Sequence, residues 1–99
     1  MVTKDEARRF LSDCAPEQCF WVNNGPILKN IEELASTLPD ISDDIFQHHV
    51  NSEKNDFSNW IKYVIGDEKL ANDVLSSKNK DSALKKVRNR LNSLRKKAS

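Results

Sequence analysis

The apolar residues of this chain recur three and four positions apart in short runs, and most runs are bounded by a capping residue, a proline or a glycine. The clearest run comprises Ile31, Leu34, Ala35 and Leu38. Asn30 precedes it and Pro39 follows it. This spacing lines up apolar side chains on one face of an α-helix. We therefore expect a mainly α fold, a compact bundle of about five or six short helices.

Capping residues predict where the other helices begin. Thr3 with Glu6 forms a capping box, in which each side chain bonds the other residue's backbone N–H. Asn30 and Glu33 repeat that pattern before the run described above. The further predicted starts are Ser42, then Asn55 or Asp56, then Asp67, and Gly66 is a predicted helix end. The last helix is expected over about residues 82–97, with Leu84, Val87, Leu91, Leu94 and Ala98 on its apolar face.

One segment favours extended structure. Residues 19–22 are apolar or aromatic, and Asn23, Asn24 and Gly25 form a turn signal because Asn and Gly tolerate positive φ. We expect a small β-hairpin near residues 20–28. The predicted core comprises Phe10, Phe20, Leu34, Leu38, Phe46, Phe57, Trp60, Ile61, Val64, Leu70, Val74, Leu84, Val87 and Leu91. Ala71 and Leu75 are also expected to point inward.

Charge divides the chain into two parts. At 99 residues it is long enough for a single domain, residues 1–99. Residues 1–76 form an acidic body with seven Lys or Arg and fourteen Asp or Glu, whereas residues 77–99 form a basic C-terminal helix with nine Lys or Arg and only Asp81. The candidate nucleic-acid-binding residues are Lys85, Lys86, Arg88, Arg90, Arg95, Lys96 and Lys97. The basic helix either packs back on the acidic body or binds a polyanion, and the sequence leaves both open.

The thiol and histidine residues suggest no metal and no cofactor. Cys14 and Cys19 with His48 and His49 contain the right elements for zinc, but their spacing is unlike that of paired zinc ligands. The N-terminus lacks the apolar segment of a secretory signal. We therefore expect a cytoplasmic location with free thiols, where a disulfide between the two cysteines is disfavoured. No run approaches the roughly 18 apolar residues of a membrane span, so we expect no membrane partner.

A polar and aromatic cluster follows the predicted third helix. It comprises His49, Asn51, Asn55, Asp56 and Trp60. The simpler interpretation is structural: two helix caps, core aromatics, and a core histidine bonded to Asp56 or to a backbone carbonyl. The functional alternative is a shallow groove in which these side chains bind a ligand or a peptide. A His49–Asp56 pair also resembles the start of a general-base arrangement, but no nucleophile accompanies it in the sequence.

Four stretches of the sequence resemble a known family. They are residues 20–30 (FWVNNGPILKN), 46–51 (FQHHVN), 55–61 (NDFSNWI) and 66–71 (GDEKLA). Together they are similar to a family of small, uncharacterised, mainly helical domains found in archaea and some bacteria, and the H-x-N…N-D-F-x-x-W motif is the most specific part. The resemblance implies a compact helical unit and implies no activity. It does not extend to the basic helix.

Three functions are compatible with these features. The leading one is a non-enzymatic interaction module that binds a protein partner or a small ligand at the His49–Trp60 cluster. The alternative is a nucleic-acid-associated protein that uses the basic C-terminal helix. An acid–base or metal-dependent enzyme using His49 and Asp56 ranks third, and the sequence does not predict the oligomeric state.

Overall fold

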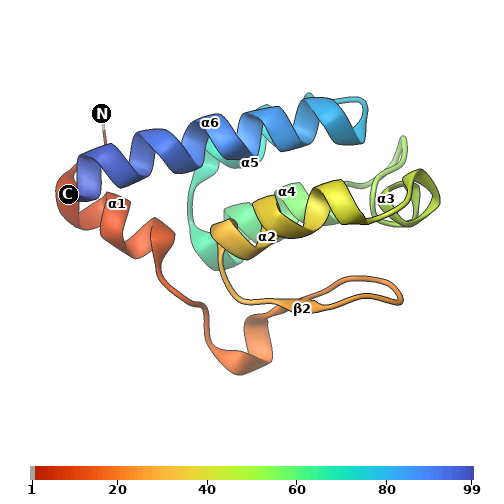
Figure 1. Cartoon of the computed structure of the whole chain (residues 1–99), viewed down its shortest axis with the longest axis horizontal. Coiled ribbons are helices and arrows are strands. Elements are labelled where there is room, and N and C mark those ends of the chain that lie inside the picture. Colours follow the sequence, from red (N-terminus) through yellow and green to blue (C-terminus); the bar gives the residue numbers. More distant parts are fainter. Residues whose placement is uncertain (1) are drawn as a thin grey trace.

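The longest element is the C-terminal helix α6 (Lys80–Ala98), which lies along one side of the molecule (Figure 1). The computed structural model describes residues 2–99 and measures 36 × 27 × 23 Å along its principal axes. Helices α1 (Lys4–Leu11), α2 (Ile31–Thr37) and α5 (Glu68–Leu75) pack against α6. Helix α1 and the C-terminal end of α6 lie at the same end of the molecule.

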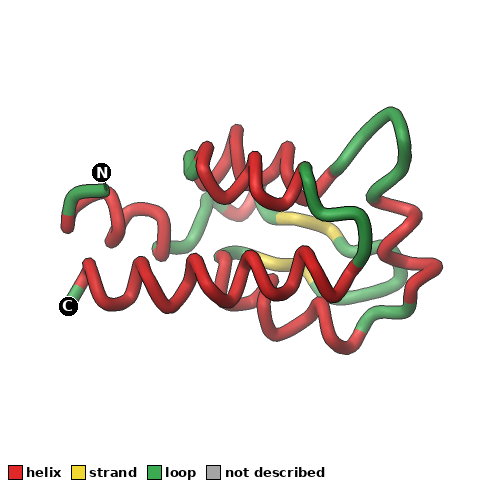
Figure 2. Tube along the Cα trace, turned by 90° about the horizontal axis from the view of Figure 1, so that it is seen from above, coloured by secondary structure: helices red, strands yellow, loops and turns green. Residues whose placement is uncertain are grey.

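The remaining elements complete a mainly helical bundle. They are α3 (Asp43–His49), α4 (Asp56–Trp60), the 3₁₀ turns η1 (Pro16–Gln18) and η2 (Leu38–Asp40), and the π-helical turn η3 (Ile61–Ile65). The expected fold class, a helical bundle with a small hairpin, is confirmed (Figure 2). No helix within residues 2–99 is both long enough and apolar enough to cross a membrane.

The predicted hairpin is present and short. Strand β1 (Phe20–Trp21) pairs antiparallel with β2 (Ile27–Leu28), with Phe20 opposite Leu28 and Trp21 opposite Ile27. Asn24 takes the left-handed conformation of the turn, with φ of 56°. Because side chains alternate along a strand, Phe20 and Leu28 enter the core, whereas Trp21 is 71% exposed. The hairpin lies on the opposite side of the molecule from α6.

The predicted caps hold with two refinements. The side chains of Thr3, Asn30, Ser42, Asn55 and Asp67 each accept a backbone N–H in the first turn of a helix. At α4 the cap is Asn55 rather than Asp56. Glu33 departs from the capping-box pattern, because its Oε1 accepts the Lys29 N–H at 2.8 Å instead of the N–H of Asn30. Asn79 caps α6, which therefore begins at Lys80, two residues before the predicted start.

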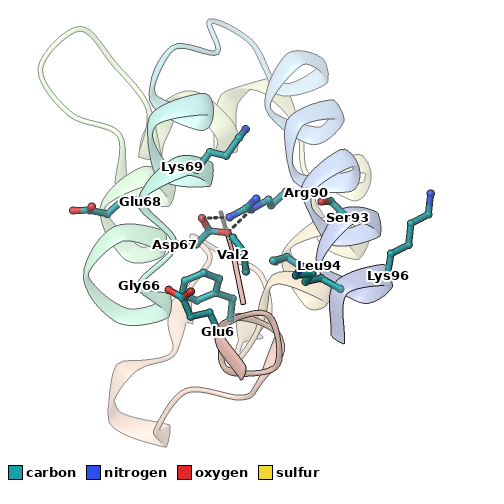
Figure 3. Close-up of a pocket in the computed structure, with 12 residues that line it drawn as sticks. Val2, Glu6, Gly66, Asp67, Glu68, Lys69, Arg90, Ser93, Leu94 and Lys96 are labelled. Carbon is teal, nitrogen blue, oxygen red and sulfur yellow. Dashed lines mark hydrogen bonds and ion pairs between the residues drawn. The ribbon is translucent and has the colours of Figure 1, made fainter. Parts of the chain in front are cut away.

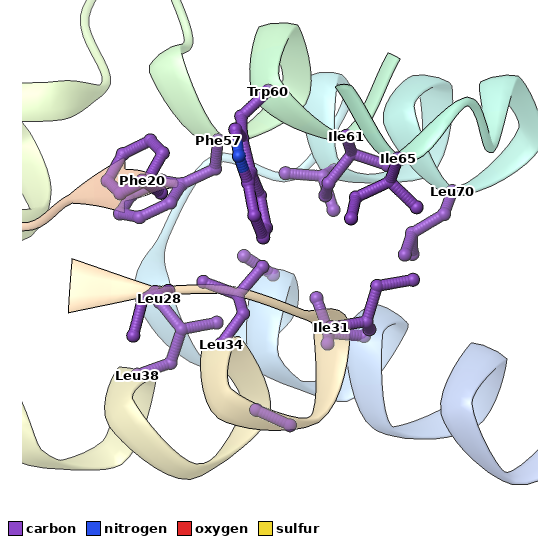
Figure 4. Packing of buried hydrophobic residues seen from close by; sticks show 14 of the residues in the cluster. Phe20, Leu28, Ile31, Leu34, Leu38, Phe57, Trp60, Ile61, Ile65 and Leu70 are labelled. Carbon is purple, nitrogen blue, oxygen red and sulfur yellow. The ribbon is translucent and has the colours of Figure 1, made fainter. Parts of the chain in front are cut away.

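The core lies between α4 and η3 on one side and α2 with β2 on the other (Figure 4). Phe57 stacks between Phe20 and Phe46, with ring centroids 4.8 Å and 5.7 Å away. Every predicted core residue is buried except Val64, which is half-buried. Residues that the prediction omitted, including Ile31, Ile65 and Leu94, are also buried.

The error at Val64 has a backbone cause. The Gly66 N–H donates to the Ile61 carbonyl at 2.8 Å, a bond over five residues rather than four. This π-helical turn adds a residue per turn and rotates the following side chains around the axis. Ile65 therefore occupies the inward position that α-helical spacing assigns to Val64.

Leu75 was also predicted inward, and this prediction is wrong because the side chain is 60% exposed. Helix α5 buries Leu70, Ala71 and Val74 against α4 and α6. Leu75 is the last residue of α5 and lies about 100° around the axis from Val74, which turns it away from both neighbours.

Candidate functional site

His49 is a buried histidine whose two ring nitrogens both have partners inside the protein. Its side chain packs against the rings of both Phe20 and Phe57, and the residue is 5% exposed. Nε2 accepts the backbone N–H of Asn23 at 3.0 Å, and Nδ1 lies 3.0 Å from Oδ2 of Asp56. Because a backbone N–H is only a donor, Nε2 carries no proton and Nδ1–H donates to Asp56. The ring therefore ties the hairpin turn to the start of α4.

Asp56 receives a second donor from its own loop. Lys54 Nζ donates to Oδ2 of Asp56 at 2.9 Å, beside the bond from His49. Partial burial raises the pKa of the Asp56 carboxyl, but the hydrogen bonds from Lys54 and His49 outweigh that effect and hold the pKa below its usual range. Asp56 is thus a charged acceptor that fixes the histidine, and the structural interpretation of the His49–Asp56 pair fits this geometry.

The two asparagines of the cluster bond inside the chain. Oδ1 of Asn51 accepts the N–H groups of Glu53 and Lys54 and so shapes the loop before α4. Asn55 is buried, caps α4 through the N–H of Ser58, and donates its amide to the carbonyl of Val74 at 3.3 Å. Both residues therefore serve the loop and the helix start.

Trp60 closes the list of predicted ligand-binding residues. Its indole is in the core, and Nε1 donates to the Gln18 carbonyl at 2.9 Å. The structure brings His49 and Asp56 into contact, but it places the ring of Trp60 in the interior and points the amide of Asn55 toward α5. The polar atoms of these side chains already make hydrogen bonds inside the protein, so few of them are free to bind a ligand in a groove.

The thiols and the second histidine do not gather around one point. Cys14 and Cys19 lie together, with Sγ atoms 3.8 Å apart, whereas His48 is exposed on α3. Within residues 2–99 no three His, Cys, Asp or Glu side chains are grouped as a metal site requires.

Two of the seven basic candidates on α6 are engaged with acidic residues of the body. Arg90 makes a bidentate ion pair with Asp67, in which both side chains are largely buried. Arg95 Nη2 lies 3.2 Å from Oε2 of Glu32 in an exposed pair. Arg90 therefore has a structural role. Its burial argues against the prediction that it contacts nucleic acid.

The other five candidates project into solvent. They are Lys85, Lys86, Arg88, Lys96 and Lys97, all exposed, and none of them is ion-paired within the described part of the chain. We define the basic face as these five residues together with Arg95. Lys85 and Lys96 are eleven residues apart, which is three helical turns, so they lie on one line about 16 Å apart. The same holds for Lys86 and Lys97, so that the basic face consists of two groups of three cations, one at residues 85–88 near the middle of α6 and one at residues 95–97 near its C-terminal end.

An open pocket of about 890 Å³ lies where α1 and the start of α5 meet α6 (Figure 3). Phe10 and Leu94 supply apolar walls, and the Asp67–Arg90 ion pair crosses the interior. Lys96 is drawn pointing away from the ion pair, toward solvent. The pocket carries no set of unpartnered polar groups that converge on one point, so we assign it no ligand.

Sequence reasoning found the cap at Asp67 but missed its ion pair with Arg90. A buried acidic cap together with a basic residue placed 23 positions later carries no local signal, because only the packing of α6 on α5 brings them together. Comparisons of the chain with protein-family models, with curated proteins and with solved structures found no significant match. The resemblance of residues 20–71 to a family of helical domains therefore stays a prediction from the sequence motif.

Proposed function

We propose that this protein is a non-enzymatic interaction module whose partner is a nucleic acid, bound through the basic face of α6. The observation that carries the proposal is the placement of charge on this helix. Its apolar stripe is buried against α1, α2 and α5, and five cations on the opposite side extend into solvent without an acidic partner among residues 2–99. The sequence left open whether the basic helix packs on the acidic body or binds a polyanion. This arrangement allows both, because the apolar side of α6 packs on the body while the basic face stays exposed to solvent.

The distribution of charge supports an oriented encounter with a polyanion. The body, residues 1–76, has twice as many acidic as basic residues, whereas the basic face belongs to α6, the helix that lies along one side of the molecule. A polyanion is attracted to α6 and repelled by much of the remaining surface, which steers the approach even though the net charge of the chain is only +1.

The chemistry of the basic face favours contacts to the phosphate backbone over reading of bases. Residues 77–99 contain no aromatic side chain on which an unpaired base stacks. Lysine and arginine side chains neutralise phosphates without regard to sequence. We therefore propose salt-sensitive, sequence-independent binding of a duplex. A nucleic-acid partner and free thiols both fit the cytoplasmic location expected from the sequence.

The His49–Trp60 cluster supports a ligand or peptide site less well. Its buried polar atoms already have partners, and a ligand there competes with the bonds to Asn23, Gln18 and Val74. The non-enzymatic part of the proposal rests on the same observation, since both nitrogens of His49 are occupied.

The test is a binding titration of a short DNA duplex of mixed sequence in low-salt buffer. The variant Lys85→Gln/Lys96→Gln removes two cations from the outermost line of the basic face. The matched control Lys29→Gln/Lys62→Gln also removes two positive charges, one from the residue after β2 and one from η3, outside the basic face. We expect the α6 variant to bind about tenfold more weakly than wild type and the control to bind within about twofold of it. Equal losses in the two variants, or no binding by wild type, would overturn the proposal.

A further inference from the structure

Cys14 and Cys19 are held beside each other by the backbone. They flank the 3₁₀ turn η1, and their Sγ atoms are 3.8 Å apart. The Cys14 N–H donates to the Lys29 carbonyl at 2.8 Å, which anchors one end of the turn next to the hairpin. On the other end the Cys19 thiol faces the Ala15 carbonyl at 3.7 Å. Both residues are half-buried, so a small reagent reaches them from solvent.

The separation of the thiols is close to that of a bonded pair. A disulfide has a sulfur–sulfur distance of about 2.05 Å, so closure needs an approach of about 1.8 Å. In the proposed reaction this approach comes from rotation about the two Cα–Cβ bonds together with movement of the turn between the cysteines. The loop that would be closed is short and already folded.

We propose that Cys14 and Cys19 form a dithiol oxidation site that a hydroperoxide converts to an intramolecular disulfide. The Cys19 thiolate, formed by loss of its proton to water, attacks one oxygen of the peroxide. The O–O bond breaks, the released oxygen leaves as water after taking up a proton, and Cys19 becomes a sulfenic acid. The Cys14 sulfur then attacks the Cys19 sulfur, the S–S bond forms and the S–O bond breaks. A second water leaves with the Cys14 proton, so two thiols and one hydrogen peroxide give one disulfide and two molecules of water, whereas an alkyl hydroperoxide gives one disulfide, one alcohol and one water.

The order of the two steps follows from the surroundings of the thiols. Burial, followed by the neighbouring Cys19 thiol, raises the pKa of Cys14 to about 11. Cys14 is therefore almost entirely a thiol at neutral pH and a poor first nucleophile, since the thiolate is the reactive form. It is well placed as the second nucleophile, because its sulfur lies against that of Cys19.

The indole N–H of Trp60 offers a spectroscopic signal that is sensitive to this reaction. Gln18, the last residue of η1, accepts the indole N–H of Trp60, so a change in the turn between the cysteines alters the surroundings of that proton. The other tryptophan, Trp21, is exposed on the outer face of the hairpin and makes no such bond. Two indole N–H signals therefore distinguish a local change at η1 from general damage.

The experiment treats the folded, fully reduced protein with a small excess of hydrogen peroxide and then alkylates the remaining thiols. We expect a monomer that has lost two hydrogen atoms, about 2 Da, with both thiols blocked to alkylation together. The Trp60 indole N–H resonance should move while that of Trp21 stays, and dithiothreitol should restore the starting spectrum. The variant Cys14→Ser should stop at the sulfenic acid of Cys19, which an added dimedone probe captures.

Two comparisons make the proposal falsifiable. With dimedone present in both reactions, the folded protein should give at least about tenfold more disulfide relative to dimedone adduct than the chain in concentrated urea, because the unfolded chain does not hold Cys14 against the Cys19 sulfenic acid. The same ratio of disulfide to adduct in the folded and unfolded chain would overturn the proposal. So would products that gain about 16 or 32 Da without any disulfide, or dimers linked between chains.

Discussion

Arg90 donates two parallel hydrogen bonds to Asp67, from Nε to Oδ2 at 2.7 Å and from Nη2 to Oδ1 at 2.9 Å. Asp67 is only 1% exposed, and its Oδ1 also accepts the N–H of Leu70 as the cap of α5. One carboxylate thus starts a helix and holds the C-terminal helix against it. The contact fixes the rotation of α6, and with it the side from which the basic face points outward.

Removing the arginine should be costly because the carboxylate stays behind. We expect Arg90→Met to lower the free energy of unfolding by about 3–5 kcal/mol, the usual penalty for an uncompensated buried charge. Urea denaturation measures this loss. The control is Arg95→Met, which breaks the exposed pair with Glu32 and should cost less than about 1 kcal/mol. Similar costs for the two variants would contradict a structural role of Arg90.

The His49–Asp56 contact predicts a specific sensitivity to acid. Because the folded-state pKa of Asp56 lies below its unfolded value of about 3.9, its ionised form contributes stability that is fully present above that value. The contribution is lost as the pH falls through the folded pKa. We expect Asp56→Asn to be less stable than wild type at neutral pH and the difference to shrink below about pH 4. Urea denaturation at several pH values checks this, and a constant difference would contradict it.

Gly66 ends the π-helical turn in the left-handed conformation, with φ of 93°. An added Cβ would lie 3.7 Å from Phe10 Cε1, an ordinary contact, so the cost of a side chain comes from the backbone alone. We expect Gly66→Ala to destabilise the protein by about 1–2 kcal/mol and Gly66→Asn by less, since Asn tolerates this conformation. Thermal unfolding compares the two variants. An alanine variant as stable as wild type would refute this account of the helix end.

The fold was predictable to the extent that it depends on local signals. Caps at Thr3, Asn30, Ser42 and Asp67 lie next to the N–H groups that they bind, so their positions are visible in the sequence. The turn at Asn24 is equally local. The π-helical turn was missed because the sequence of residues 61–65 is compatible with an ordinary α-helix, and only the packing of Ile65 distinguishes the two.

The candidate sites required contacts between distant segments. The sequence suggested that His49 bonds either Asp56 or a backbone carbonyl, and the structure shows the bond to Asp56. This contact was within reach of the sequence because only one short loop separates the two residues. It gave no sign that the second nitrogen of His49 holds Asn23 in the hairpin, or that Arg90 is withdrawn from the basic face by Asp67. Both contacts depend on how segments that are remote in sequence pack together, the hairpin turn against α3 in the first case and α6 against the start of α5 in the second.

The salt dependence of duplex binding tests the central claim most directly. Each lysine that neutralises a phosphate should add about −0.9 to the slope of log Kd⁻¹ against log salt concentration. We therefore expect a steep negative slope for wild type. The slope of Lys85→Gln/Lys96→Gln should be less steep than that of wild type by about two, and the slope of Lys29→Gln/Lys62→Gln should equal that of wild type. A slope near zero for wild type, or the same slope in all three proteins, would contradict binding through the basic face of α6.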